Sequence, residues 1–256
     1  MIELPAGDAI LHVDEVNGGR IAGLTIGGFD VIVGCEGRDR PSSWGCFPMA
    51  PWAGRTRHGR FRFDGRDYTL PMNHPPHAMH GTVYDQAWTV TGPSELTVDL
   101  GPNWPFAGHA VHRFTLTPSR LQCVIEVHAD DVPMPAAIGW HPWFVKPDSL
   151  TFTAGSMLRL DAEDIPDGTL ATPPPPGPWD DCFIDVVQPT VLRWGDLSIE
   201  ISSDCTDWIV YDKPDATTCV EPQSSPPNAL GNSPFVVQPG TPLTRQMTWQ
   251  WRHDAP

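Results

Sequence analysis

The sequence predicts an all-β protein, built as a large antiparallel β-sandwich. Short runs of alternating apolar and polar residues recur at intervals of about ten residues, with turn residues between them. The 256 residues include 23 glycines and 30 prolines, a density that interrupts helices. No segment shows the apolar periodicity of a helix of three turns. Because sandwiches of this length commonly form one unit, we expect a single domain over residues 1–256.

Each predicted strand is bounded by turn signals. Gly27-Gly28 separates two short β-rich runs, and Asp64-Gly65 lies between two alternating runs as a strong hairpin signal. Pro118-Ser119 separates two longer runs. Further strands are predicted within residues 87–101, 150–164, 185–204, 207–223 and 241–253. The proline-rich loop 172–179 is the one candidate linker, but strand patterning continues on both sides of it, which favours one domain.

Charge and composition exclude several classes of partner. The net charge is −15 and no basic patch is evident, so no nucleic-acid partner is expected. No apolar run reaches the ~18 residues needed to span a bilayer, and the N-terminus has no signal-peptide pattern. The six cysteines form no CxxC pair. We therefore expect a cytoplasmic protein with reduced thiols and no membrane partner.

The histidine-rich middle of the chain raises the question of a metal site. His74, His77 and His80 follow one another at three-residue intervals, but Pro75-Pro76 prevents a regular helix that would align them. We expect no bound metal. No GxGxxG, GxxxxGK[ST] or GxSxG motif is present. The chemistry is therefore expected to need no cofactor and to consist of proton transfer.

Two histidines and a glutamate are candidates for that chemistry. His141 lies in AAIGWHPWFVKP, where Trp140, Trp143 and Phe144 suit either a packed core or a pocket that stacks a ring-shaped ligand. His80, before Gly81, is either a loop histidine capping a strand or a hydrogen-bond donor to a ligand. Glu221 is expected at a strand end, where a carboxylate is solvated unless it projects into a pocket with a histidine and acts as a general base.

Charged residues elsewhere suggest binding contacts. PWAGRTRHGRF carries Arg55, Arg57 and Arg60, which form either a solvated basic turn or guanidinium forks directed at hydroxyls or a phosphate. PWDDCFID places Asp180 and Asp181 after the proline-rich loop.

Taken in order, these segments resemble the aldose 1-epimerase (mutarotase) family over most of the chain, from about Gly28 to Trp251. PWAGRTRHGRFRFDGRDYTLPMN is similar to the family's Asn-Arg pair before a Gly-x-Phe hairpin, and HAMHG to its His-Gly element. MPAAIGWHPWF, WDDCF and VEPQSSPPNAL resemble its second histidine, aspartate and Glu-x-Gln elements. Gly54 departs from the family pattern, because asparagine often stands there.

The resemblance implies a fold and a reaction. The fold is the galactose mutarotase-like supersandwich, a large antiparallel β-sandwich. The reaction interconverts the α and β anomers of an aldose without metal or organic cofactor. Glu221 corresponds to the general base and His141 to the general acid. The expected substrate-binding residues are His80, near the ring oxygen, with Arg55, Asp180, its neighbour Asp181 and Trp143.

Three alternatives stay open at this point. The substrate is a free aldose or a hexose 6-phosphate, the latter held by Arg55, Arg57 and Arg60. A non-catalytic carbohydrate-binding protein would keep the aromatic surfaces and could lose the acid and base. A histidine-metal enzyme fits poorly, because proline interrupts the HPPH segment. In each sugar-dependent case we expect a small-molecule sugar as partner and a monomer or homodimer.

Overall fold

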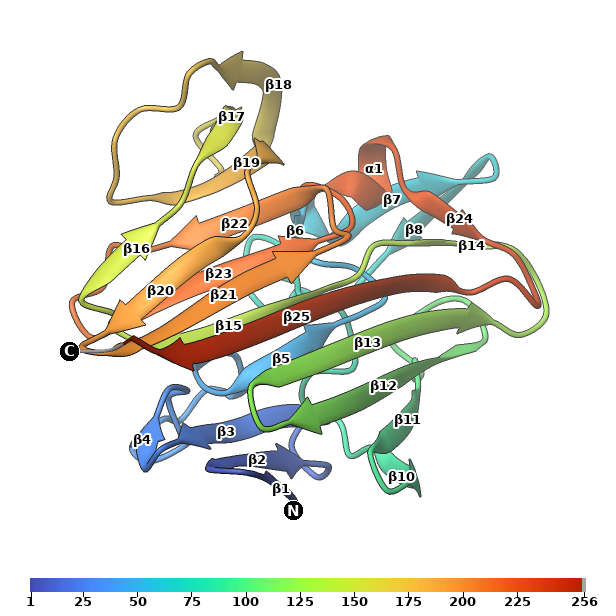
Figure 1. The fold of residues 1–256 in the computed structure, drawn as a ribbon. Coiled ribbons are helices and arrows are strands. Elements are labelled where there is room, and N and C mark those ends of the chain that lie inside the picture. The colour runs from blue at the N-terminus through green and yellow to red at the C-terminus, as the bar shows by residue number, and fades with distance from the viewer. Residues whose placement is uncertain (255–256) are drawn as a thin grey trace.

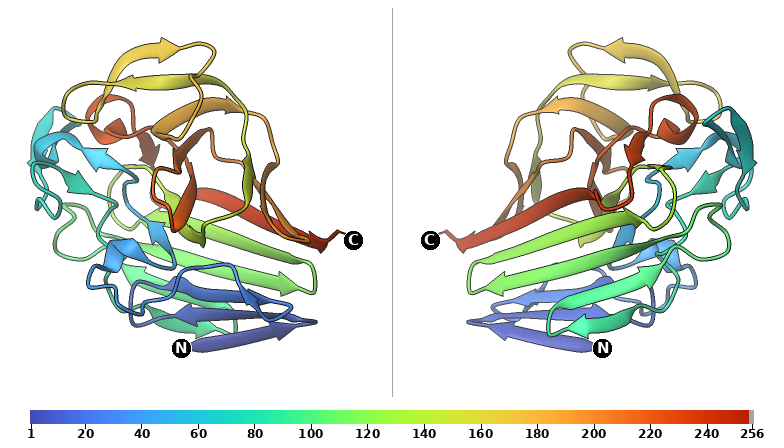
Figure 2. Two further views of the ribbon diagram at one scale, coloured as in Figure 1. Left: turned by 90° about the vertical axis from the view of Figure 1, so that its left-hand side faces the viewer. Right: turned by 90° about the vertical axis from the view of Figure 1, so that its right-hand side faces the viewer.

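The computed structural model describes residues 1–254, which form antiparallel strands, one single-turn α-helix, α1 (Ala229–Asn232), and two short 3₁₀ helices, Pro41–Ser43 and Arg57–Gly59 (Figure 1). The larger sheet has eleven strands. Its order is β1 (Ile2–Ala6), β2 (Ala9–Asp14), β3 (Arg20–Ile26), β5 (Cys46–Met49), β15 (Gly139–Val145), β23 (Thr217–Gln223), β22 (Asp207–Tyr211), β19 (Asp180–Val186), β17 (Ala154–Leu160) and β18 (Pro166–Ala171), with β4 (Phe29–Asp30) beside β3. Figure 2 shows β18 and the N-terminal strands at opposite ends of the molecule.

The second sheet has eight strands and includes the longest of the chain. Its order is β10 (Thr89–Gly92), β11 (Glu95–Asp99), β12 (Gly108–Thr117), β13 (Arg120–Ala129), β25 (Leu243–His253), β21 (Leu197–Ser203), β20 (Thr190–Trp194) and β16 (Ser149–Thr151). All its pairings are antiparallel. The all-β antiparallel fold predicted from the sequence is therefore confirmed.

The main core lies between these two sheets. Trp140 and Phe144 of β15 and Trp249 of β25 are almost fully buried in one apolar cluster. The rings of Phe144 and Trp249 have centroids 4.9 Å apart, so the sheets contact each other through aromatic side chains. This leaves the other face of the larger sheet free to carry polar groups, because side chains alternate between the two faces of a strand.

Three two-stranded ribbons complete the structure. They are β6 (Arg55–Thr56) with β9 (Ala78–Met79), β7 (Arg60–Phe63) with β8 (Arg66–Thr69), and β14 (Met134–Ala136) with β24 (Phe235–Val237). The predicted hairpin at Asp64-Gly65 joins β7 to β8, where both residues have positive φ of 46° and 74°. Within residues 1–254, no helix has the length and apolar character needed to cross a membrane.

Candidate active site

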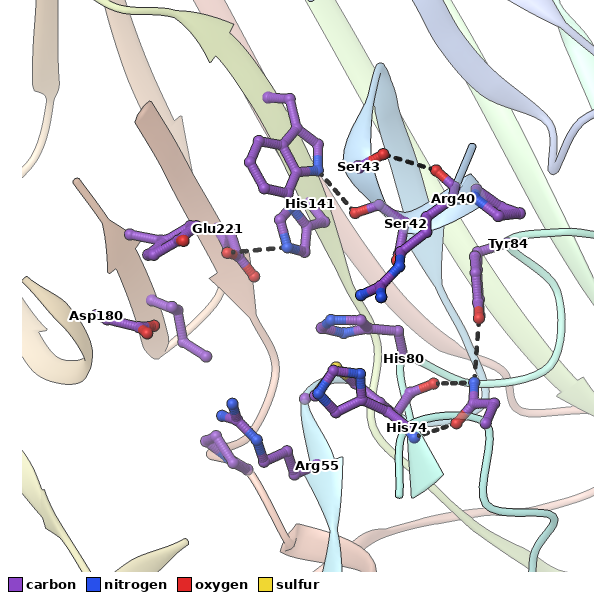
Figure 3. Close-up of a pocket in the computed structure, with 18 of the residues that line it drawn as sticks. Arg40, Ser42, Ser43, Arg55, His74, His80, Tyr84, His141, Asp180 and Glu221 are labelled. Carbon is purple, nitrogen blue, oxygen red and sulfur yellow. Dashed lines mark hydrogen bonds and ion pairs between the residues drawn. The ribbon is translucent and has the colours of Figure 1, made fainter. Parts of the chain in front are cut away.

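A cavity of about 780 Å³ opens on the face of the eleven-stranded sheet that points away from the main core (Figure 3). This volume lies within the range of about 300–1,000 Å³ typical of small-molecule sites. Strands β15, β19, β22 and β23 supply its floor, and loops near residues 40–43, 54–55 and 73–84 supply its walls. Six of the seven residues predicted for the site line this cavity, namely Arg55, His80, His141, Trp143, Asp180 and Glu221.

The alternation of β15 decides which of its aromatic residues face the cavity. His141 and Trp143 point into the cavity, whereas Trp140 and Phe144 point into the main core. Residues two apart on a strand share a face, so the rings of His141 and Trp143 stack at 5.1 Å. Trp143 is fixed by its indole Nε1, which donates to the Ser42 carbonyl at 3.0 Å. Only Trp143 of these three aromatic residues is positioned to contact a ligand.

Strand register brings His141 and Glu221 together. Gly139 pairs with Gln223 and Trp143 pairs with Cys219, so the position between them sets His141 opposite Glu221. The two atoms His141 Nε2 and Glu221 Oε1 are 3.3 Å apart (Figure 3). Glu221 lies inside β23 and not at its end, and it is 2% exposed, so of the two interpretations left open the structure has the carboxylate that projects into a pocket beside a histidine.

Burial acts in opposite senses on these two groups. It lowers the pKa of His141 to about 3 and raises the pKa of Glu221 well above its usual value, because water no longer stabilises either charge. The nearby Asp180 charge raises the pKa of Glu221 further, and a weak contact from Gln223 opposes this. Each shift favours the uncharged form of its group, and because the two atoms are in contact the groups titrate as a unit.

His80 completes the acid–base cluster from a different element. It follows β9 with φ of 62°, and its backbone N–H donates to the Gly54 carbonyl at 3.0 Å. Gly81 follows because a Cβ atom there would lie 1.9 Å from the Ala50 carbonyl oxygen. The His80 ring meets the His141 ring edge to face at 5.1 Å. Burial, followed by the charges of His141 and Arg55, lowers the pKa of His80, so a neutral imidazole faces the cavity.

Register also separates the two candidate aspartates. Asp180 pairs with Tyr211 of β22, which lines the cavity, and Asp180 lines it too. Asp181 pairs with Val210, a residue of a separate apolar cluster behind the sheet, and does not line the cavity. Burial raises the pKa of Asp180, whereas the charges of Lys213 and Arg55 lower it. The structure thus places Asp180, and not Asp181, within reach of a ligand.

The three arginines predicted to bind a ligand lie in different places relative to the cavity. Arg55 lines the cavity. Arg57 points away from it, where its guanidinium group binds Asp161 and Glu163. Arg60 is exposed on β7 and lies outside the cavity. A clamp made of all three arginines is therefore wrong, because only the first reaches the cavity.

Several residues of the cavity were not predicted from the sequence. Arg40, Ser42, His74, Tyr84 and Tyr211 all contribute to its walls. Most lie on loops, where no periodic pattern marks the side chains that turn inward. A signal was present only for Tyr211, which shares an alternating strand with Ile209.

Arg20 supports one wall from behind. Its side chain is fully buried and donates to the backbone carbonyls of Asn17, Pro41, Trp44 and Tyr84. Its guanidinium carbon also lies 4.1 Å from the centroid of the Trp44 ring. Burial lowers the pKa of Arg20 to about 10, so the group stays charged at neutral pH. Arg20 thereby fixes the 40–44 loop against the segment that carries Tyr84.

Among residues 1–254, one set of side chains has the spacing needed to hold a metal ion, and it lies in this site. His141, Cys219 and Glu221 each place a ligand atom within 4.8 Å of the others. All three are buried, and two of them already contact each other. His74, His77 and His80, which were considered as metal ligands from the sequence, do not belong to this set. His77 is instead bound through its ring to the His58 backbone N–H at 3.2 Å and the Glu163 carbonyl at 3.0 Å.

Comparison with known proteins identifies the family of this chain. The sequence model of the family described as aldose 1-epimerase matches residues 17–178. The chain belongs to the aldose 1-epimerase family. The match ends before Glu221, so the pairing of β15 with β23 is what joins that residue to the family's matched region.

Relatives of the aldose 1-epimerase family share the fold. A galactose mutarotase-like protein from Clostridium acetobutylicum superposes with a TM-score of 0.85 at 15% identity, over 98% of this chain and 94% of that one. Galactose 1-epimerase from Lactobacillus acidophilus gives a TM-score of 0.81 at 15% identity, over 98% and 93%. YihR of Escherichia coli strain K12, an uncharacterized protein, is 25% identical over 174 residues, which are 64% of this chain. The match spans 56% of YihR, little more than half of its length.

The structure explains why position 54 can carry glycine where the aldose 1-epimerase family often has asparagine. Gly54 has φ of 66°, and a Cβ atom there would lie 3.1 Å from the Pro227 ring, which also lines the cavity. A side chain at this position would therefore press on Pro227. The Arg55 backbone is held independently, because its carbonyl accepts the Asn228 N–H at 2.6 Å.

Proposed function

We propose that this protein interconverts the α and β anomers of an aldose by general acid–base catalysis. The observation that supports this most directly is the contact of 3.3 Å between His141 Nε2 and Glu221 Oε1 on the floor of the cavity. When the pair carries one proton and that proton is on His141, Glu221 is a carboxylate base and His141 is an imidazolium acid. General acid or base groups typically contribute about 10²–10⁴-fold each.

The proposed reaction uses that proton in a closed sequence. Glu221 takes the proton from the C1 hydroxyl while His141 gives one to the ring oxygen, and the C1–O5 bond breaks to give the aldehyde. Rotation about C1–C2 then presents the other face of the carbonyl. The ring closes as His141 takes its proton back from O5 and Glu221 returns one to O1. Both groups end in the state in which they began.

The remaining side chains are assigned binding roles. His80 lies against His141 at 5.1 Å between ring centroids and would contact the sugar near its ring oxygen. Asp180 and Arg55 offer an acceptor and donors to hydroxyl groups. Trp143 presents an aromatic surface on which the C–H face of a sugar can pack.

The proposal is tested by NMR exchange spectroscopy of α and β anomers over a panel of aldoses. We expect exchange well above the buffer rate for the wild-type protein. Glu221→Gln keeps the size and hydrogen-bonding capacity of the side chain but removes the base, so exchange should fall by about 10²–10⁴-fold. Asp181→Asn is the matched control, because it removes a carboxylate that does not line the cavity.

A binding protein without activity is the competing function. It would bind an aldose, detected by calorimetry, while anomer exchange stayed at the buffer rate. That result for the wild-type protein across the panel would refute the catalytic proposal.

A further inference from the structure

Cys219 brings a third potential metal ligand to the pair formed by His141 and Glu221. It lies on β23 two residues before Glu221, so both side chains project from the same face of the strand. In the neighbouring strand β15, Trp143 pairs with Cys219, so the register that sets His141 opposite Glu221 continues to the thiol. The sulfur of Cys219, a ring nitrogen of His141 and a carboxyl oxygen of Glu221 all lie within 4.8 Å of one another. Three different donor groups therefore surround one point.

The Cys219 thiol takes no part in the proposed proton transfers. Cys219 is a free, fully buried cysteine, and it does not line the cavity. It pairs with Trp143 on one side and with Tyr211 on the other. The rings of Trp143 and Tyr211 meet edge to face at 5.9 Å between centroids. Because a substrate in the cavity does not reach the thiol, replacing Cys219 should leave the metal-free reaction intact.

The three donor groups select a class of metal ion. Zn²⁺ binds thiolate, imidazole and carboxylate ligands, whereas Mg²⁺ and Ca²⁺ prefer oxygen ligands. Burial raises the pKa of the Cys219 thiol, but a bound cation deprotonates a coordinating thiol outright. As thiolate, imidazole and carboxylate, Cys219, His141 and Glu221 carry two negative charges, which match the charge of Zn²⁺. The occupied site would therefore have no net charge, which limits the cost of burying the ion.

The geometry of the three groups is close to that of a zinc site. Bonds of about 2.0–2.3 Å in a tetrahedral site set the ligand atoms about 3.3–3.8 Å apart. The distance of 3.3 Å between His141 Nε2 and Glu221 Oε1 falls in this range, so the main adjustment is an approach of the thiol by up to about 1 Å (Figure 3). His141 and Glu221 line the cavity, which gives the ion an entry path and leaves a fourth position for water.

The strands that carry these ligands hold them in place. All seven residues of β23 are buried, and the strand is paired on one side with β15 and on the other with β22. Sites built on paired strands are held more precisely than sites built on loops. The backbone therefore does not need to rearrange when an ion binds.

Metal binding and proton transfer exclude each other at this site. The ion would take the lone pairs with which His141 and Glu221 carry protons in the proposed reaction, and the protons that the three groups hold would pass to the solvent. We propose that Cys219, His141 and Glu221 form a Zn²⁺ site whose occupation switches off anomer exchange. The inhibition rests on the proposed reaction, whereas binding of the ion does not.

The test measures anomer exchange by NMR as free Zn²⁺ is raised and then removed with EDTA. We expect saturating Zn²⁺ to lower the wild-type rate by about 10²-fold or more, as loss of the acid and the base implies, and EDTA to restore it. Mg²⁺ at the same concentration should have no effect. In Cys219→Ala, half-inhibition should require about 100-fold more Zn²⁺, since loss of a residue that only supports a metal ligand already costs about 10–100-fold in affinity.

Cys35→Ala is the matched control, because it removes an exposed free thiol, and its response to Zn²⁺ should equal that of the wild type. Co²⁺ supplies a measurement that does not depend on turnover. When Co²⁺ binds a thiolate, an absorption band appears in the near ultraviolet. This band should appear in the wild type and in Cys35→Ala and be absent from Cys219→Ala. Cys219→Ser, which keeps the size of the side chain but not the thiolate, should behave as Cys219→Ala and guards against a folding defect.

Equal half-inhibition by Zn²⁺ in Cys219→Ala and Cys35→Ala would overturn the inference. Anomer exchange that Zn²⁺ does not inhibit, without a thiolate band for Co²⁺, would leave the reaction standing and refute the metal site. A Co²⁺ band that depends on Cys219, in a protein that exchanges no aldose of the panel, would support the metal site and refute the proposed reaction.

Discussion

His112 packs against the core face of strand β15, and His141 projects from the opposite face of that strand, yet the two histidines share several physical properties. Each is buried, and burial lowers the pKa of His112 to about 4 and that of His141 to about 3. His112 lies in the core, where its Nδ1 meets the Gly19 carbonyl at 3.0 Å and its Nε2 accepts the Trp140 indole N–H at 3.1 Å. His141 instead faces a cavity and a carboxylate, and its Nδ1 has no partner among the described residues.

The difference shows that a depressed pKa alone does not mark a catalytic histidine. Both nitrogens of His112 are satisfied by groups that do not titrate near neutral pH, so its proton stays in place. His141 is paired with a group that exchanges protons, and it borders space for a ligand. Partner chemistry and access distinguish the two residues where burial does not.

The largest effect expected from this comparison is on the reaction rate. His141→Asn should lower kcat for anomer exchange by about 10²–10⁴-fold, because the acid that protonates the ring oxygen is lost. Exchange NMR with a responsive aldose measures the rate, and circular dichroism checks the fold. Wild-type turnover in a folded His141→Asn protein would contradict the assignment.

Replacing His112 in the core should lower the stability of the protein without lowering the rate of anomer exchange. His112→Leu leaves the Gly19 carbonyl and the Trp140 indole unpaired, at a cost of about 1–3 kcal/mol in the free energy of unfolding. Urea denaturation at neutral pH measures this loss, while kcat should stay within about twofold of the wild type. A large fall in kcat with unchanged stability would reverse the roles given to the two histidines.

The difference in stability between the wild type and His112→Leu should become smaller at acidic pH. The native His112 has a lowered pKa, so below about pH 6.5 the unfolded chain binds a proton that the native one does not. This group contributes stability above about pH 6.5 and loses it, at about 1.4 kcal/mol per pH unit, down to the folded pKa of about 4. Urea titrations of wild type and His112→Leu at several pH values should therefore converge as the pH falls.

The two faces of β15 should also separate the roles of its tryptophans. Trp143→Leu removes an aromatic surface from the cavity and should raise KM by up to about tenfold, as the loss of about 0.5–1.5 kcal/mol of aromatic contact implies. Trp140→Leu is the matched variant on the core face, and it should lower the free energy of unfolding with KM unchanged. Steady-state exchange kinetics and denaturation of both variants test this.

The smallest effect concerns pH. The His141–Glu221 pair gains its second proton at the lowered pKa of His141, about 3, and loses its last proton at the raised pKa of Glu221. Below this range the base is lost, and above it the acid is lost. As the pH is lowered from 7 to 5, kcat should therefore not fall once the buffer rate is subtracted. Loss of half the activity on acidification through ~6.5 would contradict the lowered pKa of His141.

The sequence was informative where periodicity governs structure. The alternating runs around Pro118-Ser119 and Asp64-Gly65 predicted the β12–β13 and β7–β8 pairings, because strand period and turn chemistry are local properties. Six side chains assigned by resemblance lie around one cavity. The strands that contain His141 and Glu221 were visible, but the register that sets them opposite each other arises from pairing between distant segments.

Other features of the site could not be predicted from local sequence patterns. The choice between Asp180 and Asp181 depends on which face of β19 meets the cavity, and alternation gives two faces without saying which is which. Arg40 and His74 turn inward from loops that have no period. Arg20 begins strand β3, where a charged residue suggests solvent exposure, yet backbone carbonyls from two distant segments enclose it.

The way Arg20 holds the cavity wall has an evolutionary consequence. Its guanidinium group binds main-chain oxygens, which every amino acid possesses, so the identity of the side chains at positions 40, 42 and 43 does not enter the anchor. Mutations can therefore exchange the groups that this loop presents to a ligand while its backbone path is preserved. A lineage carrying such an anchor can change the contacts that this wall offers to a ligand while the strands that hold His141 and Glu221 stay as they are.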